Sequence, residues 1–100
     1  MTKFFPASDV PEGAVGRLKS LLAGMTSFGQ ACLGEVLYPG DSAPTPGLMV
    51  ECIGTGYRDD AHTISVVMRP YFVSRGVFNV VPVPPGPWWE GMMASGVKIR

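Results

Sequence analysis

Charge is what this sequence has least of. Charged residues make up 16% of its 100 residues, against about a quarter in an average soluble domain. Lysine plus arginine equals aspartate plus glutamate at 8 each, so the formal net charge is zero. A neutral chain has no electrostatic drive toward a nucleic-acid backbone or an anionic membrane surface. We therefore expect no nucleic-acid partner and no membrane partner.

Cysteine and histidine are also scarce, at 2 and 1. Cys32 and Cys52 both fall in apolar runs, where a free thiol usually behaves as a small hydrophobe, and two cysteines do not make a disulfide framework. His62 follows Asp59 and Asp60, which would suit a hard metal or a hydrolytic site. A catalytic zinc needs about three protein ligands, and a polar hairpin turn explains the same residues more simply. We expect no metal, no cofactor and no enzymatic activity.

Long apolar runs are missing too, although 46% of the residues are hydrophobic. No stretch approaches the ~18 unbroken apolar residues of a membrane span. Lys3 precedes only Phe4 and Phe5 before Pro6, which is too short for the apolar core of a signal peptide. We expect a chain without a cleaved leader, made in a reducing cytoplasm.

Glycine and proline, in contrast, are abundant, at 13 and 10 residues. They are dispersed among β-branched and aromatic residues, which favours turn-rich β structure over a disordered low-complexity segment. A chain of this length has room for about one hydrophobic core. We expect residues 1–100 to form one small domain, with residues 1–8 as an N-terminal arm.

A helix is predicted over residues 9–25. Asp9 and Glu12 have the spacing of a capping box, and Pro11 lies in the first turn, where its missing N–H is harmless. Apolar residues then recur at helical spacing, and glycine at position 24 or 29 should end the helix. This apolar stripe consists of Val15, Leu18, Leu22 and Met25.

Between residues 28 and 81 the pattern changes to that of β-strands. The predicted strands are Gln30–Tyr38, Leu48–Gly56, Thr63–Val73 and Val77–Val81. The second and third should form a hairpin, and the turn Ser74–Gly76 should lead to the fourth. Residues 94–100 should add a C-terminal strand. The fold class is therefore α+β, with one N-terminal helix packed on a small antiparallel β-sheet or partly open β-barrel.

The most distinctive segment, residues 82–93, combines four prolines with both tryptophans. Proline fixes φ and removes a hydrogen-bond donor, so the segment is expected to run as an extended arm that costs little entropy to immobilise. Trp88 and Trp89 suit core packing and a protein interface about equally, and the neighbouring methionines adapt well to an imperfect partner surface. The candidate interface residues are Phe4, Phe5, Pro82, Pro84, Pro85, Pro87, Trp88, Trp89, Met92 and Met93.

These features together predict a structural assembly protein. In size, β-rich character and lack of a catalytic motif the chain is similar to small virion components of tailed bacteriophages, such as capsid decoration (cement) proteins or other head or tail proteins. That similarity implies location in the virion and other protein subunits as partners: a major capsid or other virion protein, and the chain itself as a homo-oligomer. The alternative is a monomeric binding module or inhibitor acting on a single host protein. An enzyme is least favoured, because no nucleophile, base and orienting group can be named together.

Overall fold

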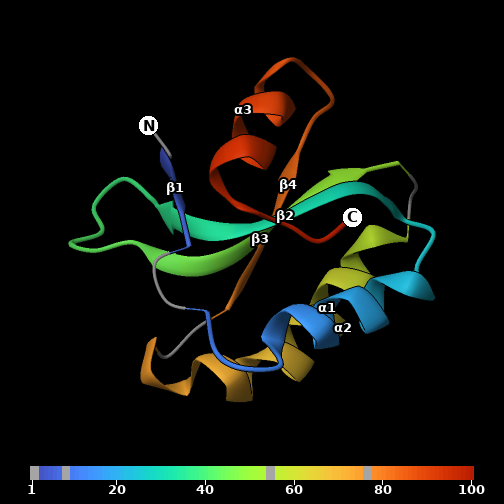
Figure 1. The fold of residues 1–100 in the computed structure, drawn as a ribbon, viewed down its shortest axis with the longest axis horizontal. Coiled ribbons are helices and arrows are strands. Elements are labelled where there is room, and N and C mark those ends of the chain that lie inside the picture. The colour runs from blue at the N-terminus through green and yellow to red at the C-terminus, as the bar shows by residue number, and fades with distance from the viewer. Residues whose placement is uncertain (1–2, 8–9, 54–55, 76–77) are drawn as a thin grey trace.

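The computed structural model describes residues 3–7, 10–53, 56–75 and 78–100, and these form an α+β fold (Figure 1). In chain order the elements are β1 (Lys3–Pro6), α1 (Ala14–Ala23), β2 (Phe28–Leu37), β3 (Thr45–Cys52), α2 (Tyr57–Met68), the 3₁₀ segment η1 (Arg69–Arg75), β4 (Asn79–Val83), α3 (Trp88–Ser95) and β5 (Val97–Lys98). Within the described ranges, no helix combines the length and the apolar character needed to cross a bilayer.

The five strands form one mixed sheet that does not close into a barrel. Its order is β1-β2-β3-β4, with β1–β2 and β2–β3 antiparallel and β3–β4 parallel. Two short strands share the remaining edge of β2: β1 pairs with residues 34–37 and β5 pairs with residues 32–33. The expected α+β class is thus confirmed, while the expected all-antiparallel sheet, the partly open barrel and the single N-terminal helix are wrong.

Helices cover both faces of the sheet. In Figure 1, α1 and α2 lie on one side and α3 lies on the other. Side chains alternate between the faces of a strand, so each face has its own buried cluster. The larger cluster, on the α1–α2 side, includes Leu18, Leu22, Phe28, Leu33, Leu48, Val50, Ile64, Met68, Phe72 and Phe78. The smaller, on the α3 side, consists of Cys32, Val36, Met49, Val81, Val83 and Trp89.

Helix α1 follows the predicted stripe but is shorter than expected. Leu18 and Leu22 are fully buried, and Gly24 follows the last helical residue, as predicted. The helix begins only at Ala14, with Gly13 at its N-cap, and the predicted cap residue Asp9 lies outside the described residues. The C-terminal end of α1 is capped by a residue far along the chain. The Arg100 guanidinium donates hydrogen bonds to the carbonyl oxygens of Leu22, at 2.6 Å, and Met25, at 2.9 Å.

The largest correction concerns the predicted strand Thr63–Val73, which is helical. Residues 57–75 form α2 and η1, so β3 and β4 are joined through a helix and run parallel instead of forming a hairpin. Ile64 and Met68 are buried four residues apart, whereas Val66 is 47% exposed. That spacing is helical, and it places Val66 on the solvent side of α2. Of the predicted turn Ser74–Gly76, Gly76 lies outside the described residues.

The predicted arm at residues 82–93 is also different from what we expected. Pro82 and Val83 belong to β4 and pair with β3, and Pro82 is tolerated there because β4 is an edge strand. The chain then turns, and α3 begins directly after Pro87, which occupies its N-cap. The expected C-terminal strand over residues 94–100 is reduced to Val97–Lys98.

Candidate functional site

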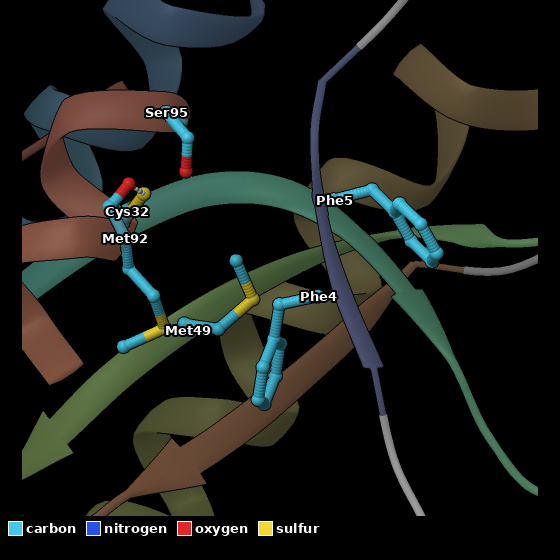
Figure 2. A pocket seen from close by; sticks show the side chains of 7 residues that line it. Phe4, Phe5, Cys32, Met49, Met92 and Ser95 are labelled. Atoms are coloured by element: carbon cyan, nitrogen blue, oxygen red, sulfur yellow. Dashed lines mark hydrogen bonds between the residues drawn. The ribbon is translucent and has the colours of Figure 1, made fainter.

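Strand β1 places two phenylalanines at the rim of the sheet. Phe4 lies opposite Val36 and Phe5 opposite Glu35, so the two rings project to opposite faces (Figure 2). Phe4 is 40% exposed and Phe5 39%. The strand lies unusually close to β2 at Gly34, where an added Cβ would be 2.7 Å from the Phe5 carbonyl oxygen and 2.9 Å from Met49 Cε. Only glycine accommodates β1 at this position.

Helix α3 gives its two tryptophans different environments. Trp89 is 2% exposed and belongs to the buried cluster on the α3 side, whereas Trp88 is 49% exposed. Both indole N–H groups donate to the carbonyl oxygen of Pro84, at 2.8 Å from Trp88 Nε1 and 3.1 Å from Trp89 Nε1. The Trp88 ring lies so close to Gly86 that any side chain there would collide with it. Trp88 is therefore a large exposed ring held in one orientation.

Met92 connects these two parts of the surface. It follows Trp88 by four residues on α3, so both occupy the same helix face. Figure 2 shows its side chain extending toward Met49 and the Phe4 ring. Phe4, Trp88 and Met92 are called the β1–α3 surface below, whereas Phe5 projects to the other face of the sheet. A cavity of about 10 Å³ lies beneath it, lined by Phe4, Phe5, Cys32, Met49, Met92, Ser95 and Gly96, and it has room for about one water molecule.

The two cysteines are unpaired and lie on opposite faces of the sheet. Cys32 belongs to the α3-side cluster, and Cys52 packs against the α1–α2 side. The Cys32 thiol donates to the carbonyl oxygen of Met92 at 3.2 Å. Burial raises the pKa of both thiols, so less of the reactive thiolate is present at neutral pH. This is the opposite of what a nucleophilic cysteine requires.

His62 and the two aspartates that precede it lie on α2. His62 and Asp59 are exposed, and Asp59 and Asp60 occupy the first helical turn, where negative charge stabilises the helix dipole. The polar hairpin turn predicted for these residues is therefore wrong. Among residues 3–7, 10–53, 56–75 and 78–100, no group of three His, Cys, Asp or Glu side chains could hold a metal ion.

A second concave region lies near the other edge of the sheet. This hollow has a volume of about 340 Å³ and is lined by Cys52, Tyr57, Pro82, Val83, Pro84 and Pro85. Its volume is within the range of small-molecule sites, and its lining is mostly apolar. The prolines make its wall rigid, and none of the described residues that line it is charged.

The structure thus divides the ten candidate interface residues. Phe4, Phe5 and Met92 line one cavity, and Pro82, Pro84 and Pro85 line the hollow, while Trp88 and Trp89 both bind Pro84. Pro87 caps α3, and Met93 packs against the buried α3-side cluster. Sequence reasoning missed Gly34, whose close approach to Phe5 no local pattern encodes, and Gly86, which meets the ring of Trp88 two residues later. Comparisons with protein-family models, with curated proteins and with solved structures found no match to this chain.

Proposed function

We propose that this protein is a structural assembly protein that binds neighbouring protein subunits through the β1–α3 surface. The observation that supports this most is Trp88, a tryptophan that is half exposed and yet held by a 2.8 Å hydrogen bond and a glycine contact. Tryptophan is enriched among the residues that dominate binding energy at protein interfaces. An exposed aromatic ring with a single orientation is suited to that role.

Preorganisation favours binding because ordering a side chain on association costs about 0.5–1.5 kcal/mol. The hydrogen bond from Trp88 to Pro84 has already restricted that ring in the free chain. Met92, beside it, is flexible and polarisable, and such a side chain adapts to an imperfect partner surface. The β1–α3 surface therefore combines a rigid anchor with an adaptable neighbour.

The chemistry of the surface also indicates the kind of partner. None of Phe4, Trp88 and Met92 is charged, so the partner's surface should be apolar, and the affinity should not depend on ionic strength. The setting that we favour is a virion of a tailed bacteriophage, with the chain as a decoration (cement) protein or other head or tail component. Its partners would then be a major capsid or other virion protein and further copies of itself.

A second candidate function, a monomeric binding module or inhibitor of a host protein, is favoured by the hollow of about 340 Å³. In that case the bound group should contact Tyr57 and Pro84, while Phe4 and Met92 should stay uncovered. The two candidate functions thus differ in which surface is covered.

Acrylamide quenching of tryptophan fluorescence tests the proposal. Trp89→Phe leaves the half-exposed Trp88 as the only tryptophan, and Trp88→Phe, the matched control, leaves only the buried Trp89. We expect quenching of Trp88 to decrease as protein concentration rises, while quenching of Trp89 stays low throughout. Quenching of Trp88 that is the same at all concentrations would contradict binding between copies through this surface.

A further inference from the structure

We propose that β1 is an exchangeable strand: in the assembled protein, β1 of one copy pairs with β2 of a second copy. This inference rests on the proposed function, because it names the partner and the way in which the subunits are joined. Exchange replaces each contact within a chain with the same contact between chains, so only the cost of association is added.

The first argument is that β1 contributes little to the fold it belongs to. All four of its residues are exposed, and none of them belongs to either buried cluster. Its main contacts are with β2 and α3. The strand can therefore leave without removing a residue from either buried cluster.

The second argument is that the position vacated on β2 would need a strand. Val36 is fully buried, and the edge of residues 34–37 would expose unpaired backbone groups if β1 left. Gly34 allows a strand to approach closely at this edge, where a side chain would collide with Phe5 and Met49. β1 is the segment that pairs with this edge in the structure. The strand that replaces it on exchange is therefore β1 of another copy.

The third argument is reach. Four residues, 7–10, separate β1 from the turn at Pro11 that begins α1, and four extended residues span at most about 14 Å. A neighbouring copy whose β2 edge lies within this distance of α1 can accept the strand. The connection can thus reach an adjacent subunit while Pro11 and Gly13 keep their hydrogen bonds to the first turn of α1, and Ala7 would then no longer pack against the larger cluster.

Disulfide trapping tests the exchange. Lys3 and Leu37 are directly opposite in the β1–β2 register, and neither is buried. We would prepare Lys3→Cys and Leu37→Cys as separate proteins, each in a Cys52→Ser background, mix them and oxidise. Exchange predicts a covalent dimer joined between positions 3 and 37, identified by peptide mapping. Val66→Cys replaces Leu37→Cys in the control mixture, because Val66 is exposed on α2 and should not couple.

The outcomes separate this inference from the proposed function. The double variant Lys3→Cys/Leu37→Cys reports pairing within one chain. If light scattering shows oligomers but only the intramolecular disulfide forms, exchange is wrong and assembly stands. A dimer joined between two Lys3→Cys positions would indicate packing of β1 edge to edge, which also overturns exchange. A monomer at every concentration with only the intramolecular disulfide would contradict both proposals.

Discussion

The two neighbouring tryptophans should contribute very differently to stability. Trp88 and Trp89 are adjacent in sequence, and both donate to the Pro84 carbonyl oxygen. They differ in burial, with 49% of Trp88 and 2% of Trp89 exposed. Replacing each with alanine therefore compares an anchor at the surface with a core residue while leaving the local sequence the same.

The expected magnitudes follow from burial. Truncating a buried aromatic residue to alanine costs about 3–5 kcal/mol, because transfer energy is lost and a cavity remains. This range applies to Trp89→Ala. About half of Trp88 stays in water, so Trp88→Ala should cost about 1–2 kcal/mol. The lost hydrogen bond adds little, since the Pro84 carbonyl keeps the other indole as donor.

Urea unfolding followed by far-ultraviolet circular dichroism measures both losses, and unchanged m-values would show that the unfolded state is the same. The free energy of unfolding of a small domain is about 5–15 kcal/mol, so the loss expected for Trp89→Ala could take up most of it. Trp89→Phe, which keeps an aromatic ring in the core, provides a milder variant. Equal losses for Trp88→Ala and Trp89→Ala would refute the assignment of one ring to the surface and the other to the core.

Three further predictions concern the backbone, the C-terminal segment and pH. Gly34→Ala should destabilise the fold by about 1–3 kcal/mol, because the added Cβ would meet the Phe5 carbonyl oxygen. An added Cβ at Gly16 would meet no atom within 4 Å, so Gly16→Ala should stabilise α1 by up to about 1 kcal/mol. Thermal unfolding compares the two variants. Arg100→Met should cost about 1–3 kcal/mol through the lost bonds to Leu22 and Met25, and amide hydrogen exchange should accelerate in the last turn of α1. Burial raises the pKa of Cys32 above its usual 9.0, so as the pH rises the thiol of the unfolded chain ionises before that of the folded chain. The free energy of unfolding should therefore fall above about pH 9. The urea midpoint should fall less steeply with pH for Cys32→Ala than for the wild-type protein.

The sequence predicted those parts of the fold whose signals are local. Leu18 and Leu22 on α1 follow from helical spacing, and the predicted strand Gln30–Tyr38 overlaps β2, which a turn at residues 38–41 follows. In that turn the Tyr38 backbone N–H donates to Asp41 Oδ2 at 3.2 Å, and the Asp41 N–H donates to the Tyr38 carbonyl oxygen at 3.0 Å. These elements need no distant contact to be recognised.

Residues 57–75 show why the sequence predicted other parts of the fold less well. The run from Thr63 to Val67 is rich in β-branched residues, and their propensity favours a strand. Tertiary packing overrides this preference, because a helix places Ile64 and Met68 together in the core. A signal was nevertheless present: Tyr57, Ala61, Ile64 and Met68 have helical spacing, and the two aspartates mark a helix start.

The candidate site depended even more on long-range contacts. Pro87 and Glu90 are typical of a first helical turn, so α3 could have been found from them. The burial of Trp89 and the exposure of Trp88 could not have been predicted in this way, because they depend on which face of α3 packs against the sheet. The juxtaposition of Phe4 with Met92 joins residues from nearly opposite ends of the chain.

Solution mass by light scattering over a concentration series tests the central claim most directly. The wild-type protein would be compared with Trp88→Ser and with Val66→Ser, the matched control, since both residues are about half exposed but lie on opposite sides of the sheet. We predict that the wild-type and Val66→Ser proteins form oligomers of the same mass, and that Trp88→Ser dissociates at concentrations where they do not. A wild-type protein that remains monomeric at every concentration, or equal weakening by both substitutions, would contradict assembly through the β1–α3 surface.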